Sequence, residues 1–294
     1  MLCSVFLARE FPRIKKVVFS SANRGKQTSY SEIGNLEAYV QQNRNAPFTF
    51  SHTFSKLTTM KPIALVAAMP QEREALLAVF PEHREYIHYN TCMFETKLGD
   101  QKIIIAESGV GKVNAACTLT LLLSDFDPRC IINTGTAGGM QPGQQILDIV
   151  VPDEVVYTDV DVTPLGFEYG QVLGSPPRFK TCPELHKHLN AVLESMDKPP
   201  VCHRGLLGSA DSFIYKKSQI AAIKKNFENS VQCVEMEGGA IAHACSRFGV
   251  PFLILRALSD VPDKGDNAMD FNTFLPKAAA MSAQICLKLV ERII

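Results

Sequence analysis

The chain has 294 residues, 46% of them hydrophobic, and its 30 basic side chains balance 30 acidic ones. That length and composition suit one large core or two small ones and exclude a disordered or fibrous chain. A net charge near zero provides no electrostatic footprint for nucleic acid or an anionic membrane, and no apolar run reaches the roughly 18 residues that span a bilayer.

The nine cysteines are scattered, none forms a C-x-x-C pair, and several lie inside apolar runs. This pattern predicts buried free thiols in a reducing compartment and no disulfide framework or metal site. We therefore expect a soluble, cytoplasmic protein.

Residues 1–59 differ in composition from the rest of the chain. They carry eight Lys or Arg against three acids, a net charge of +5, so the other 235 residues have a net charge of −5. A basic, Ser-containing start is typical of an organelle transit peptide. The alternatives are a poorly ordered tail or a start codon placed too far upstream, because Met60 is a natural beginning. We predict an N-terminal extension over 1–59 and a folded domain over 60–294.

From Pro62 onward the hydrophobic pattern becomes regular. We expect strands at 63–68, 88–98, 102–106, 130–133, 149–152, 155–162, 206–209, 231–234 and 251–259. We expect helices at 72–80, 111–123, 183–196, 217–226, 236–248 and 271–293. This alternation predicts a single-domain, three-layer α/β/α fold with a twisted, mixed, mainly parallel central sheet. Ligands of such folds collect beyond the carboxyl ends of the strands.

Two glycine-rich segments, 108–112 and 134–139, follow predicted strands. The first fails the P-loop pattern, because Ala106 stands where that pattern needs Gly and Val113 where it needs Ser or Thr. It also fails the dinucleotide pattern, whose third Gly is Asn114 here. We interpret it as a strand-to-helix turn whose backbone lies close to a ligand. The hydroxyls and amides of the second segment are suited to a polar ligand at a strand end.

Arg256 interrupts the apolar run at 252–255. A guanidinium buried at that depth needs a carboxylate partner to offset its desolvation, and Glu72, Glu235 and Glu237 are the candidates. The alternative is an Arg that reaches solvent at the strand end. The sequence leaves both open.

Glu72 and Asp260 each have a structural and a functional interpretation. Glu72 follows the first strand and suits the first turn of a helix, where the helix dipole favours an acid. Ser259 and Asp260 end a strand, where a helix cap is the structural alternative. The loop-like residues 261–265 disfavour that alternative.

Six segments, in this order, carry a resemblance to a known family: 67–72, 108–113, 131–139, 159–163, 234–238 and 256–260. Together they resemble the 5′-methylthioadenosine/S-adenosylhomocysteine nucleosidases of the purine nucleoside phosphorylase superfamily. The match runs from about Met60 to the C-terminus. It implies a nucleoside phosphorylase-like catalytic domain over 60–294.

The resemblance implies hydrolysis of the bond between adenine and a 5′-thioribose, in methionine salvage and S-adenosylmethionine recycling. Asp260 would protonate adenine N7, oriented by Ser259. Glu237 would hold the ribose hydroxyls and favour the positive charge that develops on the sugar. Glu72 would position and deprotonate water. Leaving base, sugar and water thus have one carboxylate each.

The resemblance also implies the residues that surround the substrate. Thr136 and Arg256 would lie around the water. The ribose, the adenine and the 5′ group would contact Ala68, Met69, Val110, Gly138, Phe213, Ile214, Met236 and Phe271.

The family is homodimeric, so the neighbouring subunit would complete the 5′ pocket with Val162, Leu165, Phe167 and Leu173. No cofactor or metal is implied. The chain departs from the family at several positions: Thr136 replaces a frequent Ser, Gly238-Gly239 a more usual Ala-Thr, and Leu165 an aromatic residue.

Three other functions stay open. A phosphorylase would use phosphate, although repulsion from Glu72 disfavours that anion. Aminodeoxyfutalosine nucleosidases share the catalytic residues, and 5′-deoxyadenosine is a further candidate substrate. A non-catalytic nucleoside-binding protein is the third alternative, which the presence of all three carboxylates disfavours.

Overall fold

The structure is a computed structural model that describes residues 18–20, 27–29, 49–50, 61–261 and 267–294. The chain divides into two units, 1–59 and 60–294. In the first unit a three-stranded antiparallel sheet has β1 at its centre, and its strands are β1 (Val18–Ser20), β2 (Gln27–Ser29) and β3 (Thr49–Phe50). Our prediction of a poorly ordered or targeting extension falls mostly outside the described residues.

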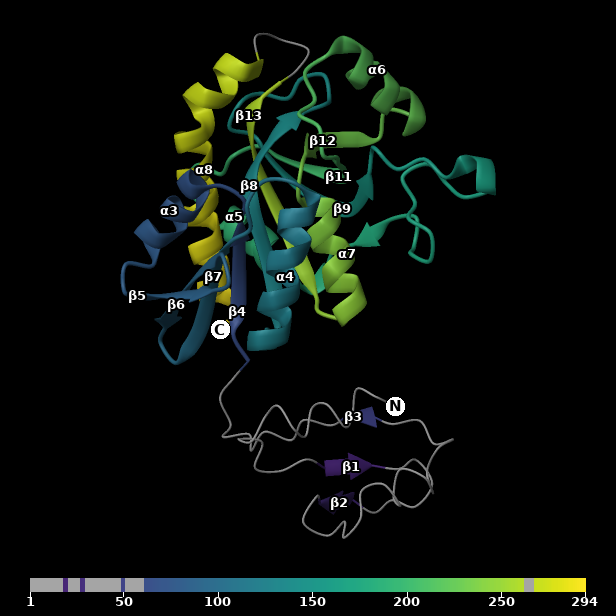
Figure 1. Ribbon diagram of the computed structural model, residues 1–294. Helices are drawn as coiled ribbons and strands as arrows, with labels where there is room; N and C mark the ends of the chain where they lie inside the picture. The colour runs from purple at the N-terminus through teal and green to yellow at the C-terminus, as the bar shows by residue number, and fades with distance from the viewer. Residues whose placement is uncertain (1–17, 21–26, 30–48, 51–60, 262–266) are drawn as a thin grey trace. The chain divides into compact units, whose positions relative to one another are not determined.

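The second unit is built on a ten-stranded sheet (Figure 1). Its strands are β4 (Ile63–Ala67), β5 (His83–His88), β6 (Thr91–Leu98), β7 (Gln101–Glu107), β8 (Cys130–Gly139), β9 (Ile149–Tyr157), β10 (Phe179–Lys180), β11 (Cys202–Ser209), β12 (Val231–Glu235) and β13 (Phe252–Asp260). Parallel pairs join β7–β4–β8–β13 and β9–β11–β12, and antiparallel pairs form both outer edges. The predicted mixed α/β sheet is confirmed.

Part of the sheet closes on itself around β13. That strand pairs in parallel with β8 and antiparallel with β9, while β9, β11, β12 and β8 pair in succession. The five strands therefore form a closed ring. Arg256 lies opposite Gly135 on one side and Val150 on the other. This closure explains why all nine residues of β13 are buried although the strand contains an arginine.

Helices cover both faces of the sheet (Figure 1). They are α3 (Pro70–Val79), α4 (Lys112–Phe126), α5 (Pro183–Glu194), α6 (Lys217–Asn226), α7 (Gly238–Phe248) and α8 (Asn267–Ile293), with a short 3₁₀ helix, η2 (Thr163–Leu165). Side chains of β4 alternate between two cores. Ala64 and Val66 belong to the core of α4 and α7, and Ile63 and Leu65 to that of α3, α5 and α8. The predicted three-layer arrangement follows from this period of two.

Three sequence-based assignments need correction. The strand predicted at 130–133 is longer than expected: β8 continues through the glycine-rich residues 134–139, because β12 and β13 pair with this half. The two strands expected at 149–162 are one strand that accommodates Pro152 opposite Gly205, next to a shift in register. Strand β5 was not predicted, because this edge strand is solvent-exposed along nearly all its length and lacks apolar alternation.

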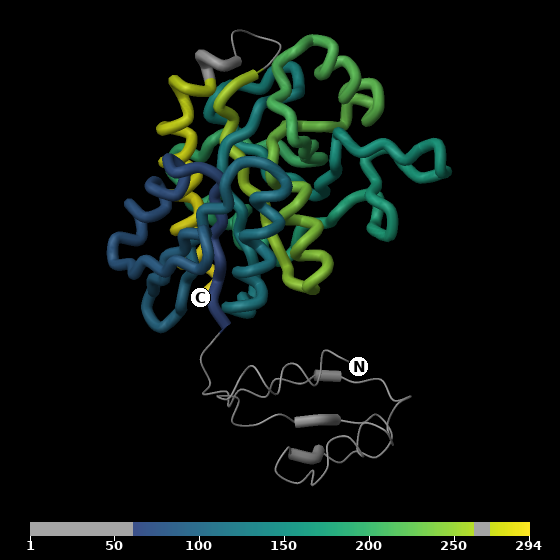
Figure 2. The backbone as a smooth tube through the Cα atoms, viewed as in Figure 1, coloured from purple at the N-terminus to yellow at the C-terminus, as the bar shows by residue number. Residues whose placement is uncertain are grey.

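Among the described residues, no helix combines the length and apolar character needed to cross a membrane. The eight cysteines in the described part of the chain carry free thiols, as the sequence predicts, and Cys3 lies outside it. Only Cys130, Cys233, Cys245 and Cys286 are buried, so the predicted burial holds for four of the eight. Between β9 and β10 the chain projects away from the sheet, in teal and green (Figure 2).

Candidate active site

A cavity of about 270 Å³ lies where the carboxyl ends of several strands meet. Its walls come from loops after β4, β7 and β11, from the ends of β8, β12 and β13, and from α8. The lining residues are Ala68, Met69, Glu72, Val110, Thr136, Ala137, Gly138, Ser212, Phe213, Ile214, Val234, Glu235, Met236, Glu237, Ser259, Asp260 and Phe271. Strand ends that are distant in sequence thus converge on one site, as expected for this class of fold.

Glu72 is a buried carboxylate held by four donors. In the first turn of α3, its Oε2 accepts the backbone N–H groups of Ala68 at 3.0 Å and Met69 at 3.2 Å. Its Oε1 accepts the backbone N–H of Thr136 at 2.9 Å and the hydroxyl at 3.2 Å. Burial raises the pKa of Glu72, opposed by the charge of Arg256 and by the backbone donors. Glu72 thus lies in the first turn of a helix, as the helix-dipole interpretation predicts, and it also lines the cavity.

The neighbouring Gly135 permits this arrangement. A Cβ at that position would lie 3.0 Å from Glu72 Oε1. The glycine-rich half of β8 therefore allows its backbone to approach the Glu72 carboxylate closely. The same half of the strand lines the cavity.

Glu237 stands at the junction of β12 and α7, where it is the N-cap residue of the helix. Its Oε1 accepts the backbone N–H of Gly111 at 2.8 Å, which joins it to the loop after β7. Burial raises the pKa of Glu237 to about 8, and the charge of Glu235 adds to the increase. The carboxyl group is thus able to gain or lose a proton near neutral pH.

Glu235 is the partner of Arg256, which answers a question that the sequence left open. Arg256 Nη2 donates to Glu235 Oε2 at 2.6 Å and to Asn133 Oδ1 at 2.5 Å. Glu235 Oε2 also accepts the backbone N–H groups of Glu237 at 3.2 Å and Gly238 at 2.7 Å. The resemblance placed Arg256 around the water that Glu72 would activate. In the structure the charge of Arg256 acts to lower the pKa of Glu72, and its ion pair is with Glu235.

Ser259 and Asp260 end β13 as a pair. The Ser259 hydroxyl donates to Asp260 Oδ1 at 2.9 Å, and both residues are buried. Asp260 pairs with Gly138 of β8, and both residues line the cavity. No helix begins here: β13 runs through Asp260, and the chain is not helical at Val261.

An aromatic pair forms the outer wall of the cavity. Phe213 and Phe271 meet edge to face with their ring centroids 6.0 Å apart. Phe213 is 40% exposed, so one of its faces is free to stack on a planar ligand. Ile214 beside it is buried, and Met236 closes the inner side.

The structure separates the predicted site residues into two groups. Thirteen of them line the cavity, while Arg256, Val162, Leu165, Phe167 and Leu173 do not. Leu165, Phe167 and Leu173 are among the exposed large apolar side chains of the segment between β9 and β10. Sequence reasoning named Glu235 only as a candidate partner of Arg256, and it did not name Ala137, Ser212 or Val234 as site residues. Each of them lies next to a residue that was named. The rule that ligands bind beyond the carboxyl ends of strands could therefore have identified them.

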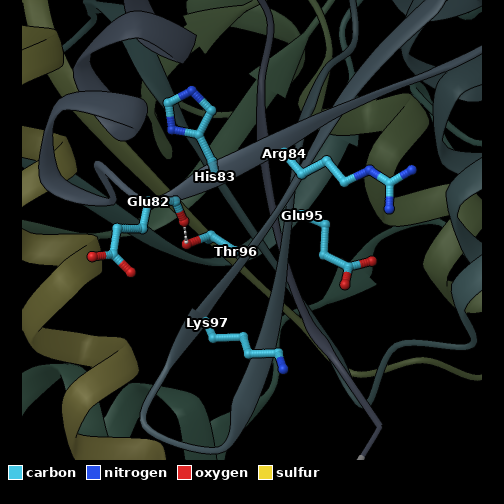
Figure 3. A pocket seen from close by; sticks show the side chains of 6 residues that line it. All are labelled: Glu82, His83, Arg84, Glu95, Thr96 and Lys97. Carbon is cyan, nitrogen blue, oxygen red and sulfur yellow. Dashed lines mark hydrogen bonds between the residues drawn. The ribbon is translucent and has the colours of Figure 1, made fainter.

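A second hollow, of about 370 Å³, lies on the hairpin of β5 and β6 (Figure 3). It is lined by Glu82, His83, Arg84, Glu95, Thr96 and Lys97, and the Thr96 hydroxyl donates to the Glu82 carbonyl at 2.6 Å. Most of these side chains are solvent-exposed, and none lines the first cavity. Catalytic sites concentrate polar groups in desolvated concave surroundings. The first cavity is therefore the candidate active site.

Comparison with known proteins agrees with this geometry. The profile of the Phosphorylase superfamily matches residues 62–291. A 5′-methylthioadenosine/S-adenosylhomocysteine nucleosidase of Exiguobacterium sp. is 38% identical over 231 residues, which cover 79% of this chain and 98% of the relative. The corresponding nucleosidase of Haemophilus influenzae strain 86-028NP is 40% identical over 79% of this chain and 99% of its own. The chain belongs to this nucleosidase family.

Solved structures of the nucleosidase family have the same fold. The enzyme of Neisseria meningitidis, in complex with methylthio-immucillin-A, superimposes with a TM-score of 0.74 at 34% identity and covers 79% of this chain and 99% of its own. A futalosine hydrolase of Helicobacter pylori reaches the same TM-score at 27% identity, with 79% of this chain and 97% of its own covered. Residues 1–59 lie outside the range that matches the superfamily profile.

Proposed function

We propose that this chain hydrolyses the N-glycosidic bonds of 5′-methylthioadenosine and S-adenosylhomocysteine, releasing adenine and the 5′-thioribose. One observation carries the proposal: Glu72, Glu237 and Asp260 arrive from three separate elements and line one cavity. Cleavage of this bond gives the sugar oxocarbenium character. It therefore calls for a proton donor at the base, an anion near the sugar and a base for water.

Asp260 is the proposed acid. Protonation of adenine N7 makes the departing base neutral, and the Ser259 hydroxyl orients the acid by donating to Asp260 Oδ1. Phe213 stacks on the adenine. Acid catalysis of this kind contributes about 10²–10⁴ in rate.

Glu237 is the proposed anion beside the sugar, and Glu72 is the proposed base for the water. In its ionised form, which the ligand-free chain gains as pH rises through about 8, Glu237 accepts hydrogen bonds from the ribose hydroxyls. These bonds strengthen as positive charge develops on the ring. Glu72, held by the backbone and hydroxyl of Thr136, takes the proton of the attacking water. Burial raises its pKa, which makes the carboxylate a stronger base than an exposed one.

A phosphorylase is the nearest rival. Phosphate would have to lie against Glu72, and the Arg256 guanidinium is already engaged with Glu235 and Asn133. Hydrolysis of aminodeoxyfutalosine is a second candidate, supported by the likeness to the futalosine hydrolase.

Adenine release by the full chain tests these alternatives. We expect release from methylthioadenosine and S-adenosylhomocysteine at a rate independent of added phosphate, with 5′-deoxyadenosine and aminodeoxyfutalosine measured beside them. A rate that requires phosphate, with sugar 1-phosphate as product, would establish a phosphorylase. Binding of adenosine analogues without turnover of any substrate would establish a binding protein.

We also propose a cytoplasmic homodimer in which the segment between β9 and β10 of one subunit completes its neighbour's 5′ pocket. The exposed Leu165, Phe167 and Leu173 support this, since a projecting apolar segment favours a protein contact. Light scattering should give the dimer mass, and Phe167→Ser should reduce activity together with dimer content.

The N-terminal peptide of the native protein, identified by mass spectrometry, distinguishes a retained extension from a removed transit peptide or a start at Met60.

A further inference from the structure

Three charged side chains join three loops just outside the cavity lining. Lys112 Nζ donates to Asp159 at 2.8 Å and 2.7 Å and lies 3.6 Å from Asp211 Oδ2. The backbone N–H of Asp211 donates to Asp159 Oδ2 at 2.9 Å. The backbone N–H of Lys112 donates to Asp211 Oδ1 at 2.7 Å. Lys112, Asp159 and Asp211, here called the Lys112 clasp, thus connect the loops after β7, β9 and β11.

Each end of the clasp is adjacent in sequence to a residue of the candidate active site. The N–H of Gly111, one residue before Lys112, is the donor to Glu237 Oε1. Phe213 follows Asp211 by two residues and lines the cavity. Gly111 has a φ of +96°, and a Cβ there would lie 3.2 Å from Asp211 Oδ1. The close approach of this carboxylate to the loop therefore depends on glycine.

The location of the clasp argues for positioning more than for stability. Its side chains are 21%, 28% and 48% exposed, and ion pairs with that much solvent contribute little to folding. Charge-assisted hydrogen bonds from backbone N–H groups to carboxylates are nevertheless strongly directional. The cluster therefore orients the peptide group between residues 111 and 112, and it contributes little to the free energy of unfolding.

We propose that the Lys112 clasp is a positioning device that aims the Gly111 N–H at Glu237 and fixes the loop of Phe213 against the purine. Asp159, Lys112 and Asp211 do not line the cavity, so their role in this proposal is to position other groups. The expected loss of catalysis rests on the proposed function. The orientation of the two loops by the Lys112 clasp does not depend on which reaction the chain catalyses.

Amide hydrogen exchange of the ligand-free full chain tests the structural part. Asp159→Asn should make the amides of Gly111 and Lys112 exchange about tenfold faster, because local opening governs exchange. Asp127→Asn is the matched control: Asp127 pairs with Lys61 at 2.8 Å at the other end of α4. Unchanged exchange at residues 109–115 in Asp159→Asn, or equal acceleration in the control, would overturn the proposal.

Kinetics test the consequence. Asp159→Asn and Lys112→Met should each lower kcat/KM for methylthioadenosine by about 10- to 100-fold with an unchanged melting temperature, because misplaced groups cost rate without unfolding the chain. Lys112→Arg, which keeps the positive charge, should retain most of the wild-type activity. The double variant Asp159→Asn/Lys112→Met should lose no more activity than either single variant. A loss that follows the melting temperature, or an additive double variant, would contradict positioning. If the wild-type chain releases no adenine, the proposed function fails, while the exchange result still decides the clasp.

Discussion

Glu235 holds Arg256 at 2.6 Å in the closed part of the sheet, with both side chains buried. The same carboxylate oxygen accepts the N–H groups of Glu237 and Gly238, so one residue neutralises the arginine and shapes the turn that presents Glu237. Glu235 therefore supports the position of Glu237, one of the proposed catalytic carboxylates, while it neutralises the buried arginine.

Replacing Glu235 by Gln should destabilise the fold. Removal of one partner of a buried ion pair costs about 3–5 kcal/mol, because the other charge stays buried without compensation. Urea unfolding measures the loss. Glu154→Gln is the control: Glu154 pairs with Arg178 at 3.4 Å near the surface, and its loss should cost about 1 kcal/mol or less. Equal losses in the two variants would contradict the structural role of Glu235.

Asp260→Asn should reduce adenine release by about 10²–10⁴ while nucleoside binding persists, because only the proton donor is removed. Single-turnover kinetics with methylthioadenosine, together with calorimetric binding of an adenosine analogue, separate the two effects. Ser259→Ala should give a smaller loss, since it removes only the hydroxyl that holds Asp260 Oδ1. Unchanged release in Asp260→Asn would assign the acid to another residue.

The raised pKa of Glu237 predicts a pH dependence of stability. Its carboxyl keeps a proton in the folded chain up to about pH 8, against 4.5 ordinarily. The folded state therefore binds more protons between these values, and stability falls as pH rises. This contribution is fully present below pH 4.5 and is lost as pH passes through about 8. The free energy of unfolding of Glu237→Gln should accordingly change less over this range than that of wild type.

Glu184→Gln provides the control for that titration. Lys187 lowers the pKa of the exposed Glu184, so this carboxyl is ionised throughout the range in which Glu237 titrates. The difference in stability between wild type and Glu184→Gln should therefore stay constant there. A constant difference for Glu237→Gln as well would show that Glu237 has an ordinary pKa.

The convergence of the strand ends was predictable from the sequence. Alternating strands and helices produce a sheet whose central strands are parallel, so their carboxyl ends lie at the same edge. Thirteen named site residues line the cavity for that reason. The partner of Arg256 was not predictable: three carboxylates were equally eligible, and only the closure of β13 against both β8 and β9 selects Glu235.

Pairing across long sequence separations also explains the other misses. Residues 134–139 resemble a turn in composition and become a strand only because β12 and β13 lie beside them. Lys112, Asp159 and Asp211 are ordinary loop charges in the sequence, and their ion pairs exist only after three loops meet. Local patterns contain no information on either arrangement.

Phe213→Ala should weaken substrate binding more than it slows chemistry. Stacking of a base on an aromatic ring is worth about 1–3 kcal/mol, so KM should rise by roughly 5- to 100-fold while kcat changes little. Tyr215→Ala is the matched control, because Tyr215 is aromatic and exposed, lies 6.4 Å from Phe213 between ring centroids, and does not line the cavity. Steady-state kinetics with methylthioadenosine measure both variants. A rise in KM of similar size in Tyr215→Ala would mean that the loop as a whole, and not the face of Phe213, holds the purine.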